Sequence, residues 1–305
     1  MLALKISLGS NSLTENNTLG FIGLGVMGGR MCRNLALKSG KQIIAFDLSS
    51  ERASALLEHG VKLASSAAEV AAIADIVFLC LPGEVQVREL CFGSGGLIEA
   101  MRAGCTLVDM TTATVDVDRD VAAALAEKGV DFADAPVARG VPSAEDGTLA
   151  ITVGASAAVL ARIDPYLRCM GTEISHCGDV GTGQVLKLMN NMLIFQTVSA
   201  LSEAMAIATR AGVDRARVFD ILSRGSADSF ALRRHGSFMT SGDYPDDWFP
   251  IDYSLKDLRY ALALAESVGV DAQCAKVAEN RLEQAQSRGW GRLYSPAIYK
   301  LFEDD

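Results

Sequence analysis

A glycine-rich turn near the start of the chain constrains the fold more than any other feature of the 305-residue sequence. An apolar segment, Leu19–Ile22, precedes the turn, and a helical pattern, Met27–Lys38, follows it. The turn consists of Gly23, Leu24, Gly25, Val26, Met27 and Gly28. In a strand–turn–helix unit with this spacing, the first glycine permits the tight turn and the second lets the backbone approach a pyrophosphate. The third lets the helix pack closely on the strand, so the motif predicts a dinucleotide-binding βαβ unit.

An acidic residue at the expected distance strengthens this prediction. Asp47 lies nineteen residues after Gly28, at the end of the second expected strand, Gln42–Phe46. A carboxylate there accepts hydrogen bonds from the adenosine ribose hydroxyls and repels a 2′-phosphate. Leu48 follows instead of the arginine that would attract such a phosphate, so the sequence favours NAD over NADP, although Arg52 leaves NADP open. The alternative is a glycine-rich turn that holds no ligand.

Short apolar segments alternate with helical patterns in the first 180 residues. Further strands are expected at Ile76–Cys80, Thr106–Asp109, Val130–Ala133, Leu149–Val153 and Glu173–His176, and further helices at Ser50–Glu58 and Val117–Lys128. This alternation predicts a Rossmann-type α/β fold with a doubly wound, mostly parallel sheet. Helices are then expected at Gln184–Ala211, Arg215–Leu222, Tyr253–Ser267 and Ala272–Gln286. We therefore expect an N-terminal tail at residues 1–18, an NAD-binding domain at 19–180 and an all-helical substrate and oligomerisation domain at 181–305.

Composition and charge narrow the class of protein. The net charge of −9 argues against a nucleic-acid partner or an anionic membrane surface, because both require a basic face. The seven cysteines form no CxxC pair and the three histidines lack ligand spacing, so we expect reduced thiols and no metal site. Neither a signal peptide nor an apolar run of about 20 residues is evident, and the sequence predicts a cytoplasmic protein without a membrane partner.

A lysine and two asparagines share one face of the long helix expected after residue 183. Lys187 is followed by Asn190 and Asn191 at i+3 and i+4, spacings that bring the three side chains together. Polar groups on an otherwise apolar helix are costly to bury without partners. Burial lowers the pKa of a lysine, so Lys187 is a candidate general acid and base for alcohol–carbonyl interconversion. The alternative is a lysine whose ammonium group reaches solvent beside two capping amides.

These segments together resemble the 3-hydroxyacid dehydrogenase family, also called 3-hydroxyisobutyrate dehydrogenase-like. The resemblance runs from about residue 19 to residue 285, and its N-terminal signature, Phe21–Leu35, departs from the family only at Cys32. The other matching segments are Asp134–Val137, Gly147–Leu149, Gly183–Asn191 and Ser254–Leu258. The proline that family members carry shortly after the Asp109–Thr112 segment is missing here, which leaves the shape of that loop open.

The resemblance implies roles for individual residues. Lys187 would give and take the proton, and Asn191 would help to orient the substrate, with Asn190 beside it. On the cofactor side, the glycine-rich turn and Asp47 would be joined by Leu81, Pro82, Thr112 and Lys256. Of these, Thr112 would lie beside the nicotinamide, and Lys256 would approach the cofactor from the second domain.

The expected substrate loop is where the sequence departs from the family most. Family members usually carry Ser-Gly-Gly after Asp-Ala-Pro-Val, whereas this chain carries Ala138, Arg139 and Gly140. The guanidinium of Arg139 is suited to hold a carboxylate, sulfonate or phosphate through two hydrogen bonds, and sulfolactaldehyde reductases resemble the chain at this position. The alternative is that Arg139 points to solvent or pairs with Glu145 or Asp146.

The leading hypothesis is an NAD-dependent dehydrogenase that interconverts a small 3-hydroxy acid and its semialdehyde by hydride transfer, with Lys187 as general acid and base. A sulfolactaldehyde reductase is the alternative within this class, and a non-catalytic dinucleotide-binding scaffold is the alternative outside it. We expect a small anionic substrate. We also expect a homodimer or homotetramer through the helical domain, because the apolar helix Gln184–Ala211 is hard to cover within about 120 residues.

Overall fold

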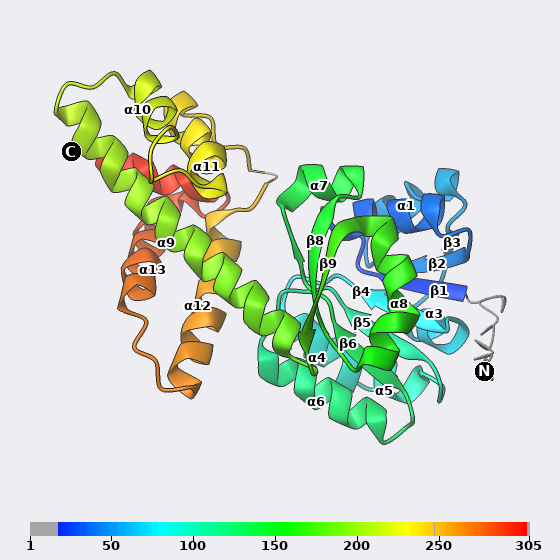
Figure 1. The fold of residues 1–305 in the computed structure, drawn as a ribbon. Coiled ribbons are helices and arrows are strands. Elements are labelled where there is room, and N and C mark those ends of the chain that lie inside the picture. The colour runs from blue at the N-terminus through cyan, green and yellow to red at the C-terminus, as the bar shows by residue number, and fades with distance from the viewer. Residues whose placement is uncertain (1–17, 247, 304–305) are drawn as a thin grey trace, which may run out of the picture.

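The computed structural model describes residues 18–246 and 248–303. An α/β part holds the sheet, and the long helix α9 (Thr182–Arg210) leaves this part and runs through a second, helical part (Figure 1). Residues 1–17 of the expected tail lie outside the described residues, so the tail stays a prediction there. Thr18 was assigned to the tail, but it already belongs to the first strand.

One sheet runs through the whole α/β part. Its strands are β1 (Thr18–Ile22), β2 (Gln42–Phe46), β3 (Lys62–Leu63), β4 (Ile76–Leu79), β5 (Thr106–Asp109), β6 (Asp131–Asp134), β7 (Val137–Ala138), β8 (Leu149–Gly154) and β9 (Gly171–Gly178). The described strands lie in the order β3-β2-β1-β4-β5-β6-β8-β7, with β9 paired to β8. Neighbouring strands are parallel along the run β3-β2-β1-β4-β5-β6, which confirms the predicted Rossmann-type sheet. The far end is mixed, because β8 runs antiparallel to β6 and β7 but parallel to β9.

Helices cover both faces of this sheet. They are α1 (Gly28–Lys38), α2 (Ser50–Ser54), α3 (Ala67–Ile73), α4 (Glu84–Phe92), α5 (Leu97–Ala100), α6 (Val115–Ala126), α7 (Gly140–Asp146) and α8 (Ala157–Met170), with a short 3-10 turn at Leu57–His59. Residues of α1 and α8 form the apolar core on one face, and residues of α3 to α6 form the core on the other. Strand β4 is buried along its whole length because both of its faces are covered.

The second part of the molecule is helical. Around α9 pack α10 (Arg215–Leu222), α11 (Phe230–Ser241), α12 (Ile251–Ser267), α13 (Gln273–Ala285) and the C-terminal 3-10 helix η3 (Ser295–Phe302). A short π-helical turn, η2 (Gln286–Trp290), follows α13. Among the described residues after β9, the only β-type pairing is an isolated bridge between Pro250 and Tyr294. The predicted helical C-terminal part is therefore confirmed.

Helix α9 starts at a point fixed by the sheet. The Asp134 carboxylate at the end of β6 accepts the backbone N–H groups of Gly181 (2.6 Å) and Gln184 (2.8 Å). A carboxylate there satisfies amides that have no partner inside the helix and complements the helix dipole. The start of α9, one turn before Lys187, is therefore anchored to β6.

By length and composition, α9 is also apolar enough to cross a membrane. A core helix passes the same test, and Phe195, Val198 and Met205 of α9 are buried in the core of the helical part. The outer side of the helix differs, because Leu193 and Ile207 are more than half exposed. The helix therefore has one face packed by this chain and one apolar face that the chain leaves open.

The structure departs from the expected elements where local signals are weak. The helix expected at Ser50–Glu58 divides into α2 and the 3-10 turn. Helices α8 and α11 are missing from the expected set, and they contain Pro165 and Gly236, residue types that disfavour helix interiors. Gly236 is needed for packing, because a Cβ there would lie 2.6 Å from Cδ2 of Phe219 on α10.

Candidate active site

The glycine-rich turn joins β1 to α1 and passes close to the end of β4. Gly23 has a φ of +92°, and a Cβ at this position would lie 2.2 Å from the Cys80 carbonyl oxygen. A Cβ on Gly28 would lie 1.9 Å from the Gly23 carbonyl oxygen, so both positions require glycine. A Cβ on Gly25 would meet nothing within 4 Å, so space remains open beside the backbone. The turn therefore has the shape that a bound pyrophosphate needs.

Asp47 lies beside this turn at the end of β2. Its Oδ2 accepts the Leu24 backbone N–H at 2.6 Å, and its Oδ1 accepts the Ser49 backbone N–H at 2.7 Å. Leu48 is 96% exposed, and Arg52 is also exposed. The turn and the carboxylate thus lie where a dinucleotide would present its pyrophosphate and adenosine ribose, and these residues fit that group.

The helical part contacts the two loops that follow β4 and β5. The Lys256 ammonium on α12 donates to the carbonyl oxygens of Pro82 (2.8 Å) and Thr112 (3.3 Å). Leu81 is tied to the second loop, since its backbone N–H donates to Thr111 Oγ1 at 3.0 Å. Tyr260, one turn after Lys256, accepts the Glu84 backbone N–H through its hydroxyl oxygen at 3.3 Å. The residues expected on the cofactor side therefore come together from both parts of the molecule.

Lys187 and Asn191 form a buried polar network on α9. The Lys187 ammonium donates to Asn191 Oδ1 (3.1 Å), and Asn190 Nδ2 donates to the same oxygen (3.0 Å). Asn191 Nδ2 donates to Asp257 Oδ2 on α12 (2.7 Å), and Asp257 Oδ1 lies 3.0 Å from the Lys256 ammonium. The residues predicted as catalytic are thus linked to the residue predicted beside the cofactor.

Burial shapes the chemistry of this lysine. Lys187 is only 8% exposed, and loss of water lowers the pKa of its ammonium group below that of a free lysine. The negative charge of Asp257 opposes this shift, and the positive charge of Lys256 adds to it. A lysine with a lowered pKa holds a larger fraction of neutral amine near pH 7, which suits an exchange of protons with a substrate oxygen.

A second group of buried polar side chains lies under the loop after β5. Asp109 and Asp118 are fully buried, and burial raises the pKa of both carboxyl groups, as does their mutual proximity for Asp118. Both oxygens of Asp118 lack a hydrogen-bond donor among the described residues, as does Gln184 Oε1. Gln184 Nε2 donates to the Thr111 carbonyl oxygen at 2.6 Å. Burial and mutual proximity therefore favour the protonated form of these carboxyl groups over a wider pH range than in free aspartate.

The expected substrate loop contains one unusual backbone conformation. Arg139 has a φ of +86°, the only positive value among the described residues other than glycine. Its guanidinium is exposed and donates to the Thr148 carbonyl oxygen (3.0 Å) and to Thr172 Oγ1 (3.2 Å). Glu145, an expected partner, pairs instead with Arg30 and Arg33. Arg139 is therefore held along β8 and β9, and its contact with a substrate anion stays a prediction.

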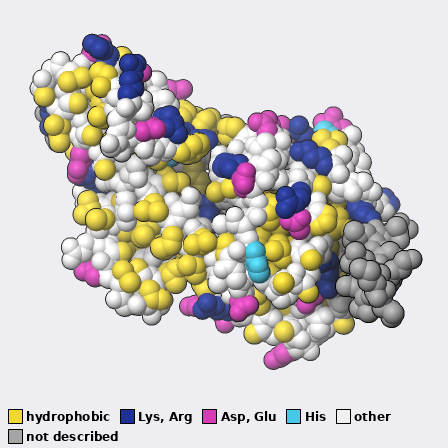
Figure 2. All heavy atoms as spheres, in the orientation of Figure 1, with side chains coloured by type: hydrophobic (Ala, Val, Ile, Leu, Met, Phe, Trp, Pro, Cys, Tyr) yellow, Lys and Arg dark blue, Asp and Glu magenta, His cyan; other side chains and the backbone are white. Residues whose placement is uncertain are grey.

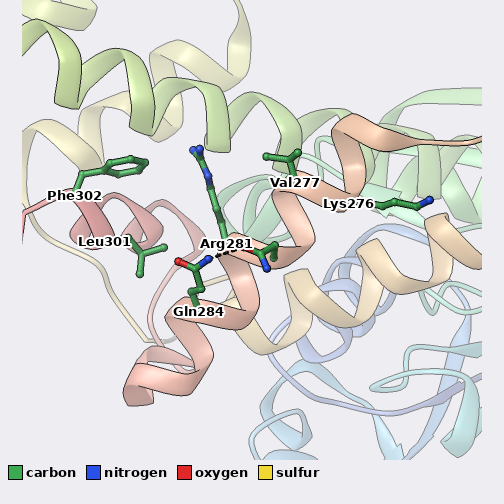
Figure 3. Close-up of a pocket in the computed structure, with 7 residues that line it drawn as sticks. Lys276, Val277, Arg281, Gln284, Leu301 and Phe302 are labelled. Atoms are coloured by element: carbon green, nitrogen blue, oxygen red, sulfur yellow. Dashed lines mark hydrogen bonds between the residues drawn. The ribbon is translucent and has the colours of Figure 1, made fainter.

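Two hollows differ in their relation to these residues. The surface is hollowed where the α/β part meets the helical part, with hydrophobic side chains in it and basic ones at its rim (Figure 2). The other hollow lies between α13 and η3, and its lining includes Val277, Arg281 and Phe302 (Figure 3). It contains none of the predicted site residues, and the Arg281 guanidinium is held by the Ser199 carbonyl oxygen at 3.0 Å. The predicted site residues that contact one another instead lie at the junction of the two parts.

Sequence reasoning missed several residues that the structure brings into this site. Asp257 lies inside a segment singled out in the sequence, but its contact with Asn191 becomes visible only in three dimensions. Gln184 also lies inside a segment singled out in the sequence, but its contact with Thr111 becomes visible only in three dimensions. Asp118 carries no motif, and burial alone distinguishes it from surface residues. Arg234 on α11 reaches the substrate loop and donates to the Arg139 carbonyl oxygen at 3.1 Å, again without a sequence signal.

The fold and the site define a dinucleotide-dependent oxidoreductase of Rossmann type. Residues 18–178 match the NAD binding domain of 6-phosphogluconate dehydrogenase, and residues 181–302 match the NAD-binding domain of NADP-dependent 3-hydroxyisobutyrate dehydrogenase. The chain is 36% identical to 2-(hydroxymethyl)glutarate dehydrogenase of Eubacterium barkeri, over 93% of this chain and 94% of the relative. It is 35% identical to 3-hydroxyisobutyrate dehydrogenase of Pseudomonas aeruginosa, over 93% of this chain and 98% of the relative.

Solved structures agree with these sequence matches. A 3-hydroxyisobutyrate dehydrogenase of Mycobacterium tuberculosis, determined with L-serine, superimposes with a TM-score of 0.85 at 29% identity, covering 94% of this chain and 99% of that one. The chain therefore belongs to the 3-hydroxyacid dehydrogenase family, which confirms the resemblance inferred from its motifs. It is accordingly an NAD(P)-dependent oxidoreductase that acts on small 3-hydroxy acids.

Proposed function

We propose that the protein interconverts a small 3-hydroxy acid and its semialdehyde, with Lys187 as the general acid and base. The observation that carries this proposal is the buried Lys187–Asn191–Asp257 network at the junction of the two parts. A bound nicotinamide would supply the acceptor or donor of a hydride, which carries two electrons to or from C3 of the substrate. The residues of this chain would hold the substrate and move the accompanying proton.

In the oxidation direction, the neutral amine of Lys187 accepts the proton of the C3 hydroxyl as the hydride leaves C3. In the reduction direction, the ammonium form returns that proton to the carbonyl oxygen. Asn191 holds the Lys187 side chain through its Oδ1, and Asp257 fixes the orientation of that amide by accepting from Nδ2. The exposed Asn190 amide donates to Asn191 Oδ1, and its remaining amide hydrogen and its oxygen would face the other polar groups of the substrate.

For the cofactor, we propose NAD as the preferred form. The Asp47 carboxylate would repel a 2′-phosphate and accept hydrogen bonds from the ribose hydroxyls. Because residues 181–302 match an NADP-dependent enzyme, both NAD and NADP must be assayed. Exchanging Asp47 for serine should shift the ratio of kcat/KM for the two cofactors toward NADP, by roughly ten-fold for a difference of about 1.4 kcal/mol.

The substrate is a small anion. The relatives from Eubacterium barkeri and Pseudomonas aeruginosa are named for 2-(hydroxymethyl)glutarate and 3-hydroxyisobutyrate, both of which carry a hydroxyl group on a carbon β to a carboxylate. The loop at residues 138–140 carries Arg139 in place of a residue of the family's Ser-Gly-Gly, and sulfolactaldehyde reductases resemble the chain there, so a sulfonate is the second candidate. A non-catalytic scaffold is disfavoured by the buried lysine, because a scaffold has no need to desolvate an ammonium group.

For the assembly, we propose that a second copy of the chain covers the open apolar face of α9. This face includes Leu186, Leu193 and Ile207, all about half exposed or more. Light scattering on a sizing column, in the buffer used for the activity assays, should then give the mass of a dimer or tetramer. A monomer at micromolar concentration would contradict this part of the proposal.

A substrate panel tests the function directly. Purified protein is assayed at 340 nm with short 3-hydroxy acids, a 2-hydroxy acid and 2,3-dihydroxypropanesulfonate, each with NAD and with NADP. The proposal predicts turnover of at least one 3-hydroxy carboxylate with a higher kcat/KM for NAD. Turnover of the sulfonate alone would favour the second candidate, and turnover of none would reject both.

A further inference from the structure

Arg234 occupies a place that the sequence gave no reason to inspect. It lies on α11, and its Nη1 donates to the carbonyl oxygen of Arg139 in the substrate loop at 3.1 Å. A Cβ built on Gly140 would lie 3.2 Å from Arg234 Nη2, so the second amino group of the guanidinium lies directly over the loop backbone. Among the described residues, Arg234 forms no ion pair with a carboxylate. The guanidinium is thus presented to the loop without a carboxylate paired to it in the described part of the chain.

The surroundings of Arg234 hold it in place without neutralising it. Its guanidinium carbon lies 5.2 Å from the centre of the Trp248 ring and 5.8 Å from that of Phe230, which are cation–π contacts. His235 follows in the helix, and burial together with the charge of Arg234 lowers its pKa to about 4. His235 is therefore neutral at pH 7, and its Nδ1 is hydrogen-bonded to the Tyr294 hydroxyl at 2.9 Å. Within this cluster the positive charge belongs to Arg234.

Strand β8 contacts both the substrate loop and the start of the helix that carries Lys187. Ala138 pairs with Ala150 of β8, and two residues further along β8 the Thr152 hydroxyl donates to the Gly183 carbonyl oxygen at 3.1 Å. Gly183 lies one helical turn before Lys187. β8 therefore connects the loop under Arg234 to the turn of α9 that carries the proposed proton donor.

The two arginines near this loop differ in what they are free to bind. The Arg139 guanidinium donates hydrogen bonds to the Thr148 carbonyl oxygen and to Thr172 Oγ1, at the outer edge of the sheet. Arg234 uses one nitrogen to fix the loop and presents the other over Gly140. A loop that has lost the family's serine hydroxyl at Ala138 needs another donor for an anion, and the guanidinium of Arg234 supplies one from the second part of the molecule.

We propose that Arg234, and not Arg139, is the residue that recognises the anionic group of the substrate. The inference rests on the proposed function, since it assumes that the substrate is a hydroxy acid bound between Lys187 and the substrate loop. The chemical class that fits is a carboxylate, one oxygen of which accepts from Arg234 while the other faces the backbone of the loop. Because Arg234 comes from the helical part, substrate binding would also hold the two parts together.

The test compares a hydroxy acid with the corresponding uncharged amide. Wild type, Arg234→Met, Arg234→Lys, Arg139→Met and Arg233→Met are assayed with 3-hydroxyisobutyrate and with its neutral amide. Arg233 is the matched control, because it is the neighbouring arginine on α11, is exposed and pairs with Asp228. The measured quantity is the ratio of kcat/KM for the acid to kcat/KM for the amide, which cancels any general damage to the site.

The inference predicts that Arg234→Met lowers this ratio roughly 10- to 100-fold, as expected for loss of a hydrogen bond to a charged group. Arg234→Lys should lower it less, and the other two variants should leave it within about three-fold of wild type. A ratio that falls in Arg139→Met but not in the Arg234 variants would overturn the inference. So would an equal loss of acid and amide turnover in both Arg234 variants.

A binding measurement separates failure of this inference from failure of the proposed function. With NAD present, 3-hydroxyisobutyrate should raise the melting temperature of wild type and of Arg233→Met but not of Arg234→Met. If wild type turns over no hydroxy acid yet shows this pattern of stabilisation, the proposed reaction is wrong and Arg234 remains the anion site. If the acid stabilises Arg234→Met as much as wild type, Arg234 is not that site.

Discussion

The cofactor side and the substrate side of the site are built by different means. The cofactor side is a backbone structure, in which Gly23 and Gly28 allow main-chain atoms to approach more closely than any side chain would permit. The substrate side is a network of buried side chains, in which Lys187, Asn191 and Asp257 depend on one another for hydrogen bonds. The first is specified within six consecutive residues, whereas the second needs residues from α9 and α12.

The two sides of the site should therefore respond differently to amino-acid substitution. A backbone cradle fails through steric overlap, so a single added methyl group should abolish it. A side-chain network fails through a lost partner, so its loss should be graded and open to rescue by an isosteric replacement. Three substitutions, taken from the largest expected effect to the smallest, can break or sharpen the contrast.

Gly28→Ala should have the largest effect. The added methyl group would lie 1.9 Å from the Gly23 carbonyl oxygen, so the turn must move, and we expect both the melting temperature and NAD affinity to fall, the latter by more than about 100-fold. Gly25→Ala is the matched variant, because its methyl group meets no protein atom within 4 Å. Gly25→Ala should keep the melting temperature and still weaken NAD, as measured by fluorescence titration. Normal NAD binding by Gly28→Ala would show that the cradle is not where the cofactor binds.

Asp257→Ala should have a smaller, graded effect. Asn191 Nδ2 would lose the acceptor that fixes its orientation, and we expect kcat to fall roughly 10- to 100-fold with little change in NAD affinity. Asp257→Asn keeps an acceptor oxygen and should recover part of kcat. Equal losses in the two variants would mean that the charge of Asp257, and not its hydrogen bond, is what the site requires.

Asp118→Asn should have the smallest effect on activity. Its main effect should be on how the free energy of unfolding depends on pH. Burial raises the pKa of Asp118, so the folded state keeps a proton that the unfolded chain loses above about pH 4. The stability of wild type should therefore fall as pH rises from 5 to 8, by up to about 1.4 kcal/mol per pH unit for one retained proton. Asparagine has no ionisable group, so the free energy of unfolding of the variant should depend less on pH. The variant should also be more stable than wild type at pH 8.

Asp120→Asn provides the control for that experiment. Asp120 lies on the same helix, α6, but is exposed and pairs with Arg88 on the surface, at 2.9 Å. Removal of an exposed ion pair should change the free energy of unfolding by less than about 1 kcal/mol and leave its pH dependence as in wild type. Identical pH profiles for wild type and Asp118→Asn in urea denaturation would contradict the retained proton.

The same contrast explains how much the sequence could reveal. The glycine spacing, Asp47 and the alternation of strands and helices predict the α/β part, because each is a local pattern with a direct steric or electrostatic cause. The Lys187–Asn191 spacing predicts a shared helix face for the same reason. The contacts of Asp257, Asp118 and Arg234 could not be predicted, because they depend on how α6, α11 and α12 pack, and no local pattern encodes that packing.

The expected role of Arg139 shows the limit most clearly. Its residue type and position in the loop predict an anion site, and that contact stays a prediction. The structure adds a positive φ at Arg139 and hydrogen bonds from its guanidinium to Thr148 and Thr172. Sequence patterns do not specify a positive φ at a non-glycine residue, so this local conformation and these two contacts could not be predicted.

The central claim is that Lys187 moves the proton, and one experiment tests it most directly. Wild type and Lys187→Ala are compared for kcat with a 3-hydroxy acid, and for NAD affinity in the same preparations. The account predicts that kcat falls about 10²- to 10⁴-fold while the Kd for NAD stays within about two-fold, and that added primary amines restore part of the turnover. A kcat within a few-fold of wild type, or one that no amine restores, would contradict it.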